Sequence, residues 1–214
     1  MGGTVFFGVS MTLHFSRPPG LEGLGKLRLA SQSPRRLELL RQVGLEPTVI
    51  PPDVDETQRS GESPVAYVER MARTKAAWGA GPEPCLGADT VVTLDGVVFG
   101  KPENGMQARH TLKYLAGRSH QVLTAVAVVI GDPPLTRSMV STTTVWMKNA
   151  SDQEIDAYVA SGESMDKAGA YGIQGLGAFL VARIEGSYTG VVGLPLFETV
   201  VLLQWAADPH RASP

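Results

Sequence analysis

One ten-residue segment combines backbone freedom with polar side chains: Asp166-Lys-Ala-Gly-Ala-Tyr-Gly-Ile-Gln-Gly175. It holds three glycines, an Asp-Lys pair and one glutamine, and shows neither a helical nor a strand period. Glycine lets a backbone adopt positive φ and approach a ligand closely. The polar side chains are then free to point at that ligand. The segment therefore predicts a binding loop, in which Asp166, Lys167 and Gln174 can point their polar groups at the ligand.

A second segment has the composition of a phosphate site. Ser31-Gln-Ser-Pro-Arg-Arg36 joins a predicted strand over 26–30 to a predicted helix over 35–43. The free N–H groups and the positive dipole end of a helix N-terminus attract phosphate, and guanidinium groups add to that. The alternative is that Ser33 merely caps the helix and that Arg35 and Arg36 are solvated. Basic residues in a first turn oppose the helix dipole, which favours the functional interpretation.

Asp89 lies in the middle of an apolar predicted strand over 86–94. A carboxylate there is costly unless it is paired, metal-bound or solvated in a cleft. The alternative is an exposed position on an edge strand, and the side-chain alternation does not decide between them. We interpret Asp89 as functional.

Three lysines complete the set of candidates. Lys75, Lys101 and Lys167 would each, taken alone, suit an ordinary surface. Together with the two arginines and the Asp55-Glu56 pair they suit a site for polyphosphate and a hard divalent cation. The Gln174 amide, a donor beside an acceptor, complements the N3–H and O4 edge of thymine or uracil.

Composition limits the function classes. The chain has 214 residues, 43% hydrophobic, and a formal net charge of −2. Such a chain suits one soluble domain, and the lack of a global basic field argues against a nucleic acid polymer as partner. The single Cys85 excludes an intramolecular disulfide, suits a reducing cytoplasm, and is interpreted as structural rather than nucleophilic. No Cys/His spacing typical of a metal site occurs.

The two ends differ in composition from the rest. Residues 1–25 carry Gly and Pro but no basic n-region or sustained apolar run, so we expect a flexible leader rather than a signal peptide or membrane anchor. Met11 is an alternative start. Residues 207–214 are expected to form a loose tail.

Between these ends, strands and helices mix without strict βαβ alternation. We therefore expect an α/β domain over 26–206, with a mixed, elongated, twisted sheet flanked by helices on both faces and two lobes around a central cleft. The predicted strands cover 26–30, 48–50, 86–94, 97–99, 121–130, 138–148 and 178–184. The predicted helices cover 35–43, 64–79, 108–116, 152–161 and 195–206.

These motifs together resemble the Maf family of nucleotide pyrophosphatases, with an ITPase-like fold, over about residues 27–204. The residues that carry the resemblance are Leu29-Ala-Ser-Gln-Ser-Pro-Arg-Arg36, Asp55-Glu56, Arg73-Thr-Lys-Ala76, Gly87-Ala-Asp-Thr-Val91, Gly100-Lys-Pro102, the loop 166–175 and Val192-Gly-Leu-Pro195.

The resemblance implies hydrolysis of a nucleoside triphosphate to the monophosphate and pyrophosphate, with Mg²⁺ or Mn²⁺. It implies Asp89 as general base with Lys75 and Lys101 beside it. Glu56, together with Asp89, would face the metal. The phosphate-site positions would be Ser31, Arg35 and Arg36.

The resemblance also implies a substrate type and an assembly. Members of the dTTP/UTP type carry Arg, Thr and Gln where this chain has Arg35, Thr90 and Gln174. Members of the 7-methyl-GTP type carry Trp, Gln and Glu there. The family further suggests a homodimer.

Two alternatives stay open. One is a house-cleaning pyrophosphatase for noncanonical purine nucleotides. The other is a nucleotide-sensing regulator of cell division without significant turnover. The combination of Asp89 with Lys75 and Lys101 favours an enzyme, because a sensor needs no general base.

Overall fold

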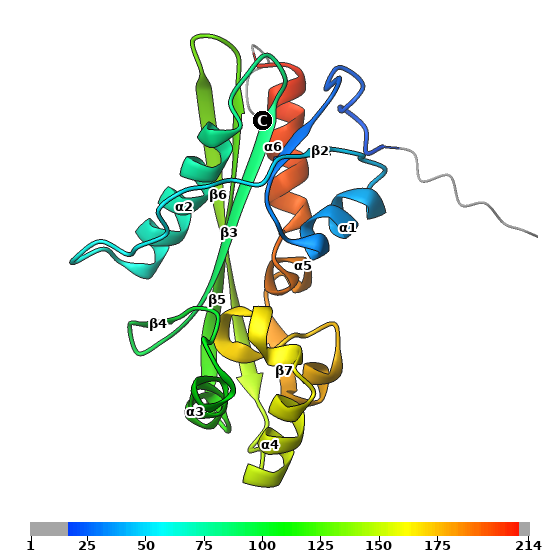
Figure 1. The fold of residues 1–214 in the computed structure, drawn as a ribbon. Coiled ribbons are helices and arrows are strands. Elements are labelled where there is room, and N and C mark those ends of the chain that lie inside the picture. The colour runs from blue at the N-terminus through cyan, green and yellow to red at the C-terminus, as the bar shows by residue number, and fades with distance from the viewer. Residues whose placement is uncertain (1–16, 210–214) are drawn as a thin grey trace, which may run out of the picture.

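The computed structural model describes residues 17–209, and within them one mixed sheet of seven strands (Figure 1). The strand order is β2-β1-β3-β5-β6-β7, with β4 paired to the far end of β3. β1 is parallel to both β2 and β3, and the other pairs are antiparallel. The strands are β1 Arg28–Ala30, β2 Thr48–Val49, β3 Cys85–Leu94, β4 Val97–Phe99, β5 Ser119–Ile130, β6 Leu135–Met147 and β7 Val181–Glu185.

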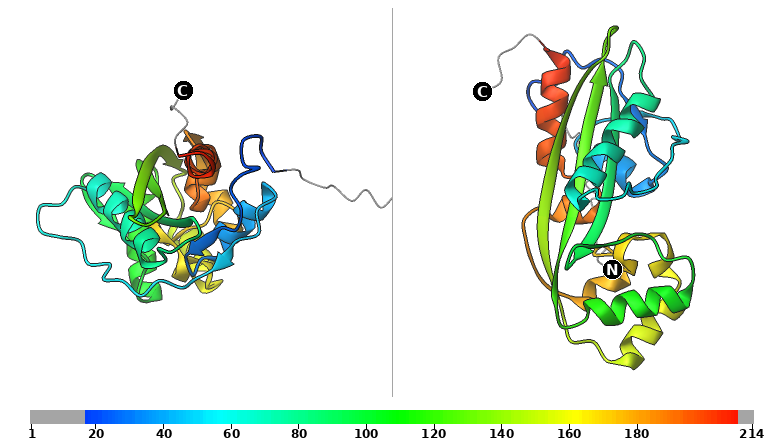
Figure 2. Two further views of the ribbon diagram at one scale, coloured as in Figure 1. Left: turned by 90° about the horizontal axis from the view of Figure 1, so that it is seen from above. Right: turned by 90° about the vertical axis from the view of Figure 1, so that its left-hand side faces the viewer.

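Helices cover both faces of this sheet, which confirms the predicted mixed α/β class. The long strands β3, β5 and β6 give the molecule its elongated, twisted form (Figure 2). The helices are α1 Pro34–Gln42, α2 Pro64–Trp78, α3 Gly105–Leu115, α4 Asp152–Ala160, α5 Tyr188–Val192 and α6 Leu196–Ala207, with 3₁₀ turns η1 Glu163–Asp166, η2 Ala168–Ala170 and η3 Leu176–Leu180.

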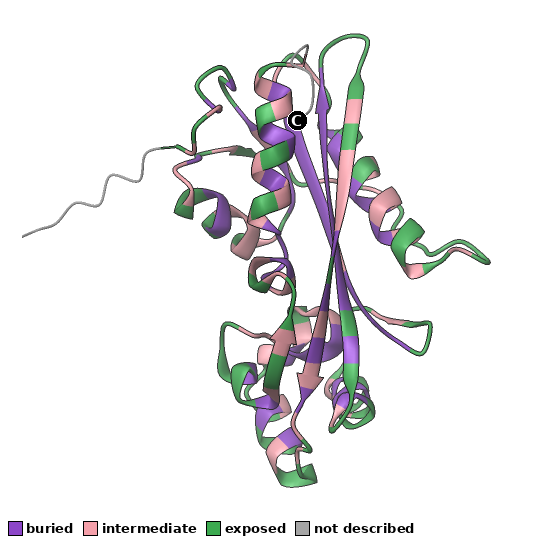
Figure 3. Ribbon diagram, turned by 180° about the vertical axis from the view of Figure 1, so that it is seen from behind, coloured by how far each residue is buried: buried purple, intermediate pink, exposed green. Residues whose placement is uncertain are grey.

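Alternation along β5 explains how the two faces are filled. Val126 and Val128 pack with α1 and α6, whereas Ala125 and Ala127 pack with α2. A strand buried on both faces has a nearly continuous apolar sequence, as β5 does. The central strands are accordingly buried in Figure 3, while the outer side of α6 is partly exposed. A further core, which includes residues of α3 and α4, lies at the opposite end of the sheet.

The contact between α2 and β3 is unusually close. A Cβ on Gly87 would lie 2.3 Å from the backbone nitrogen of Ala76 and 2.4 Å from the carbonyl oxygen of Ala72. Only a residue without a side chain permits this approach. The close packing brings Lys75 of α2 beside Asp89 of β3.

Local sequence signals placed most elements, with differences at their ends. The helix predicted over 152–161 is α4, which begins with a capping box formed by Ser151 and Glu154. The helix predicted over 108–116 begins earlier, at Gly105, because Asn104 caps it by accepting from Gln107 N–H. The strand predicted over 178–184 is instead the 3₁₀ turn η3 followed by β7. The residues that follow β7 begin α5, which Ser187 caps by accepting from the Gly190 N–H.

The predicted leader 1–25 lies in part outside the described residues, as does the end of the predicted tail. Its described part is packed rather than loose, because Leu21 and Leu24 are buried in the core with α1 and α6. The side-chain amide of Gln204 also donates to the carbonyl oxygen of Pro19 over 2.7 Å. No helix among residues 17–209 is long and apolar enough to cross a membrane.

A buried histidine lies in the core near α3 and α4. His120 of β5 is 2% exposed, and its Nε2 is 2.7 Å from the hydroxyl oxygen of Tyr171. Its Nδ1 has no hydrogen-bond partner among residues 17–209. Burial lowers the pKa of His120 to about 4. The ring is therefore neutral at neutral pH.

This histidine makes the stability depend on pH. The unfolded chain, with a histidine pKa near 6.5, takes up the proton before the folded chain does. The stabilising contribution is therefore complete above about pH 6.5 and is lost as the pH falls toward 4. We expect His120→Gln to abolish a loss of about 2 kcal/mol in the free energy of unfolding between pH 8 and pH 5. Urea denaturation at both pH values measures this free energy of unfolding.

The control is His110→Gln on α3, where the side chain is exposed. We expect this variant to keep the pH dependence of the wild type. An unchanged pH dependence in His120→Gln would contradict the assignment of this proton to His120.

Candidate active site

The cleft lies where β3 has no strand beside it on one edge. β1 pairs with β3 only at residues 85–87, and β4 pairs with it only at residues 92–94. β5 occupies the other edge. Among the described residues, 88–91 thus have no strand partner on the first side. A cleft of about 500 Å³ opens there.

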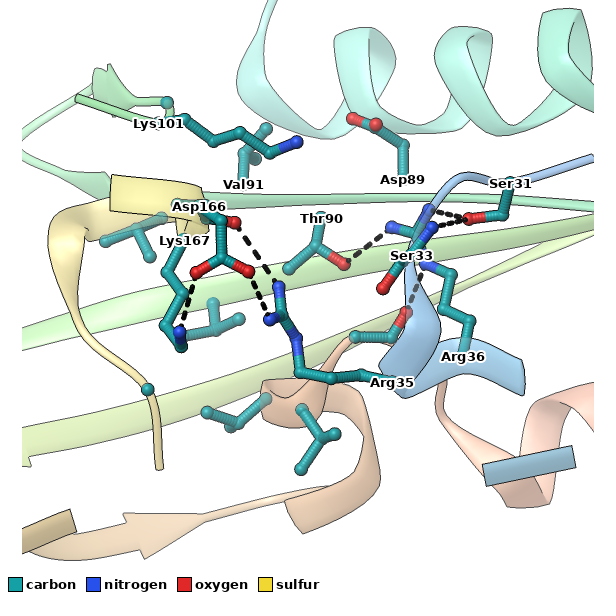
Figure 4. A pocket seen from close by; sticks show the side chains of 18 of the residues that line it. Ser31, Ser33, Arg35, Arg36, Asp89, Thr90, Val91, Lys101, Asp166 and Lys167 are labelled. Atoms are coloured by element: carbon teal, nitrogen blue, oxygen red, sulfur yellow. Dashed lines mark hydrogen bonds and ion pairs between the residues drawn. The ribbon is translucent and has the colours of Figure 1, made fainter. Parts of the chain in front are cut away.

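All ten site residues predicted from the sequence line this cleft. They are Ser31, Arg35, Arg36, Glu56, Lys75, Asp89, Thr90, Lys101, Lys167 and Gln174. Neighbouring side chains of a strand point to opposite faces, so Asp89 and Thr90 diverge. Both still reach the cleft because it lies at the open edge between the two faces (Figure 4).

On the α2 face, two carboxylates meet one ammonium group. Lys75 Nζ lies 2.7 Å from Asp89 Oδ1 and 2.8 Å from Glu56 Oε1. Lys75 and Asp89 are buried, whereas the Glu56 side chain is 58% exposed. Burial, followed by the charges of Asp89 and Glu56, raises the pKa of the nearby Tyr67 to about 12. Its hydroxyl therefore stays protonated and donates to the backbone carbonyl of Glu56 over 2.8 Å.

On the opposite face of β3, the Arg36 side chain links three segments that line the cleft. Its Nε donates to the carbonyl of Gly193 over 2.8 Å, Nη1 to Ser31 Oγ over 3.1 Å, and Nη2 to Thr90 Oγ1 over 3.3 Å. Burial lowers the pKa of Arg36, while the charge of Asp89 acts the other way. A guanidinium remains protonated in proteins, so Arg36 is a fixed donor.

Arg35 reaches across the cleft to the predicted binding loop. Its Nη1 lies 2.6 Å from Asp166 Oδ2, and Lys167 Nζ lies 2.7 Å from Asp166 Oδ1. Partial burial acts to raise the pKa of Asp166, but the bonds from Lys167 and Arg35 outweigh it and lower the pKa to about 2. The Asp166 side chain is 59% exposed, so this ion pair is weak enough for an anion to compete for Arg35.

The glycines of the predicted binding loop leave room for side chains that pack directly against the loop backbone, which the sequence alone did not indicate. A Cβ on Gly175 would lie 2.2 Å from Glu163 Oε2, and one on Gly169 would lie 2.7 Å from Val92 Cγ2. The Glu163 carboxylate accepts from the N–H groups of Leu176 and Gly177 over 2.7 and 3.0 Å. The end of the loop and the two residues that follow it are therefore packed against the Glu163 carboxylate.

Sequence reasoning did not select Glu163, and it placed Asp166 in the predicted loop without identifying its partner Arg35. Glu163 carries no motif signal, because its partners are backbone groups thirteen and fourteen positions away. Asp166 stands next to Lys167 in the loop, but its bond to Arg35 spans 131 positions.

The predicted cationic residues differ in how far they are already engaged. Lys75, Arg36 and Lys167 all donate to protein oxygens. Within residues 17–209, Lys101 has no hydrogen bond or ion pair, and its side chain extends over the cleft in Figure 4. It is therefore available to a ligand without breaking a contact.

The acidic residues fit a cation that is shared with a ligand. No group of three or more His, Cys, Asp and Glu side chains that could hold a metal ion by itself occurs in the described part of the chain. Glu56 and Asp89 nevertheless converge on the single ammonium of Lys75. Mg²⁺ is usually bound by one or two carboxylates together with substrate phosphates, and this pair suits that arrangement.

Cys85 plays no part in this cleft. Burial raises the pKa of its thiol, and a Cβ on Gly79 would lie 2.4 Å from its sulfur. Its position is consistent with the predicted packing role.

Comparison with known proteins matches the Maf-like protein family to residues 26–206. The chain belongs to this family. The matched range is also the range that the sequence predicts as the domain. Among curated relatives, a dTTP/UTP pyrophosphatase of Nitrosospira multiformis is 50% identical over 198 residues, which cover 85% of this chain and 95% of the relative.

A second such Maf-like relative, the dTTP/UTP pyrophosphatase of Chromobacterium violaceum, is 52% identical over 186 residues, covering 83% of this chain and 93% of the relative. Among solved structures, a HAM1 protein from Coxiella burnetii has 23% identity and a TM-score of 0.39, and the alignment covers 70% of this chain and 88% of that one.

The close approach of α2 to β3 predicts the effect of one added methyl group. Gly87→Ala places a Cβ against the backbone of Ala76, which must move with the whole helix. Overpacking of this kind costs about 1–3 kcal/mol, and we expect the free energy of unfolding to fall by that amount. Lys75 moves away from Asp89 with the helix, so activity is expected to fall as well.

Urea denaturation measures the stability, with Gly100→Ala as control because a Cβ there meets nothing within 4 Å. The control is expected to change stability by less than about 0.5 kcal/mol. Equal stability of the two variants would show that α2 can adjust without cost.

Proposed function

We propose that this Maf-like protein is a nucleoside triphosphate pyrophosphatase that hydrolyses dTTP and UTP to the monophosphate and pyrophosphate. The observation that carries the proposal is a buried carboxylate, Asp89, in a cleft lined by cationic side chains. The names of the relatives, dTTP/UTP pyrophosphatases at about half identity over most of the chain, support the substrate.

The charge of the cleft supports a polyphosphate ligand. Five cationic side chains line it, namely Arg35, Arg36, Lys75, Lys101 and Lys167. Three acidic ones also do, namely Glu56, Asp89 and Asp166, so positive charge exceeds negative by two. The whole chain carries a formal charge of −2. The cleft is thus a positive region on a negative protein and attracts a triphosphate locally.

Asp89 is the proposed general base. A water molecule in the cleft gives a proton to the Asp89 carboxylate as its oxygen attacks the α-phosphorus. The bond from the α-phosphorus to the bridging oxygen of the β-phosphate breaks, and pyrophosphate leaves. Lys75 holds the carboxylate in place from 2.7 Å. Lys101 and Arg35 stabilise the charge that develops on the leaving group.

Glu56 and Asp89 are the proposed ligands of a divalent cation such as Mg²⁺ or Mn²⁺, together with oxygens of the substrate. When bound, the cation supplies positive charge to the phosphates and lowers the barrier to attack by water. Ser31 and Arg36 shape the phosphate end. Lys167 supports the loop through Asp166 and through the carbonyl of Glu163, 2.7 Å from its Nζ.

Recognition of the base is proposed for Thr90 and Gln174 together with Arg35, which also lines the cleft. Gln174 is exposed and has no hydrogen bond among residues 17–209, so its amide is available to the edge of a pyrimidine. The homodimer, the cytoplasmic location and the absence of a nucleic acid partner stay predictions from the sequence.

The decisive experiment measures pyrophosphate release from a panel of pyrimidine and purine nucleoside triphosphates with Mg²⁺ or Mn²⁺. We expect selective cleavage of dTTP and UTP. Loss of a general base lowers rates by about 10²–10⁴-fold, and we expect kcat to fall by that factor in Asp89→Asn. Asp156→Asn is the matched control, since that carboxylate is also paired with a basic side chain, that of Arg109, but lies on α4, outside the cleft.

Near-normal turnover in Asp89→Asn would remove Asp89 from the role of base. Binding of dTTP without release of pyrophosphate would instead support a nucleotide sensor. Preferential cleavage of noncanonical purine triphosphates would support the house-cleaning alternative.

A further inference from the structure

Two side chains outside the cleft hold the backbone on either side of Gln174. The hydroxyl oxygen of Tyr158, in α4, accepts from the N–H of Gly172 over 3.1 Å. The carboxylate of Glu163, in η1, accepts from the first two N–H groups of η3 over 2.7 and 3.0 Å. Neither Tyr158 nor Glu163 is among the residues that line the cleft, whereas Gln174 is.

A further hydrogen bond joins these two anchors. The Tyr158 hydroxyl donates to Glu163 Oε1 over 3.0 Å. Burial acts to raise the pKa of Glu163, but the bonds from the two N–H groups of η3 outweigh it and lower the pKa, so the carboxylate is ionised at neutral pH. An ionised carboxylate only accepts and a backbone N–H only donates, which fixes the direction of every bond in this group. The Tyr158 ring itself is 3% exposed and packs edge to face against Phe179.

The glycines next to Gln174 bring the loop backbone into direct contact with both anchors. A Cβ on Gly175 would lie 2.2 Å from Glu163 Oε2. A Cβ on Gly177 would lie 2.7 Å from the Tyr158 hydroxyl oxygen. A side chain at either position would therefore displace the loop from its anchors.

Three residues, 173–175, span the gap between the anchored positions. Among them, the Gln174 side chain is exposed, and it makes no hydrogen bond among residues 17–209. Its position is therefore set by its neighbours in the chain. A free segment loses backbone entropy when a ligand orders it, and this loss weakens binding. An anchored segment has already lost that entropy on folding.

We propose that Tyr158 and Glu163 are positioning residues that hold Gln174 in place for the base of the substrate. This inference rests on the proposed function, in which Gln174 contacts the edge of the pyrimidine, and deepens it. The anchors act before the substrate arrives, so their loss lowers the affinity for a pyrimidine nucleotide. The rate of the chemical step depends instead on Asp89, which Lys75 of α2 holds in place.

The first test measures kcat and KM for UTP, by pyrophosphate release, in Tyr158→Phe and Glu163→Gln. Tyr158→Phe keeps the buried ring and removes only the hydroxyl. Glu163→Gln keeps the shape of the side chain and replaces one acceptor oxygen by an amino group. We expect each variant to raise KM about tenfold, because a buried N–H loses its acceptor, and to keep kcat within about threefold of the wild type.

A double-mutant cycle tests whether Glu163 acts through Gln174. KM for UTP is measured in Gln174→Ala, with and without Glu163→Gln. If Glu163 serves to position the amide, its loss has no further effect once the amide is absent. We therefore expect the two KM values to agree within about twofold.

Each anchor has a matched control outside the cleft. The Glu154 carboxylate also accepts from a backbone N–H, that of Ser151 over 2.8 Å. The Tyr114 hydroxyl also donates to a carboxylate, that of Asp95, over 3.2 Å. Neither Glu154 nor Tyr114 lines the cleft. We expect Glu154→Gln and Tyr114→Phe to keep the wild-type kcat and KM.

Three results would overturn the proposal. A fall of kcat at constant KM would show that the anchors serve the chemical step. An unchanged KM in Tyr158→Phe and Glu163→Gln would show that Gln174 stays in place without them. A further rise of KM when Glu163→Gln is added to Gln174→Ala would show that Glu163 acts independently of the amide. Tyr158→Phe provides the decision on KM even if Glu163→Gln does not fold.

Failure of the proposed function gives a different result. In that case the wild type releases no pyrophosphate from any triphosphate. The dissociation constant of UTP, measured by isothermal titration calorimetry, then replaces KM in the same set of variants. A tenfold weaker binding in the anchor variants still supports the positioning of Gln174, and an unchanged dissociation constant overturns it.

Discussion

A lysine and an aspartate that are buried together lose their hydration, and they are tolerated only if each satisfies the other at close range. Lys75 and Asp89 meet this condition at 2.7 Å, and much of the surrounding structure serves it. Gly87, two residues before Asp89, lets α2 approach β3 closely enough for the ammonium to reach. Glu56 then joins the same ammonium from the segment before α2. The contact between Lys75 and Asp89 therefore organises the part of the cleft in which the proposed chemistry takes place.

The second constraint is the open edge of β3. Because β1 is short and β4 pairs only near the end of β3, residues 88–91 of a central strand have no neighbouring strand on that edge, and Asp89, Thr90 and Val91 line the cleft there. Alternation then separates two tasks on successive residues. Asp89 lies with the charged groups of the α2 face, and Thr90 lies with the apolar groups of the other face. A single step along the backbone thus divides the proposed chemistry from the proposed recognition.

Most of the elements follow from local signals in the sequence. Proline at the start of α1 and α2, the Ser63 cap of α2, the Asp95-Gly96 turn and the capping box at Ser151 act within a few residues, so their effect is predictable. The misplaced elements depend on distant partners. The segment 176–180 has an apolar, strand-like sequence, but Glu163 binds its first N–H groups and turns it into η3.

The sequence by itself determined which residue types the site contains, because a carboxylate in an apolar strand and arginines at a helix start carry an energetic cost that packing alone does not explain. It also determined the mixed α/β class. Only the tertiary structure decided how those residues are connected. Arg36 joins Ser31, Thr90 and Gly193, Arg35 reaches Asp166, and Thr124 donates to Thr90. Most of these bonds join residues more than fifty positions apart, and a hydrogen bond depends on the relative position of two atoms, which no local pattern contains.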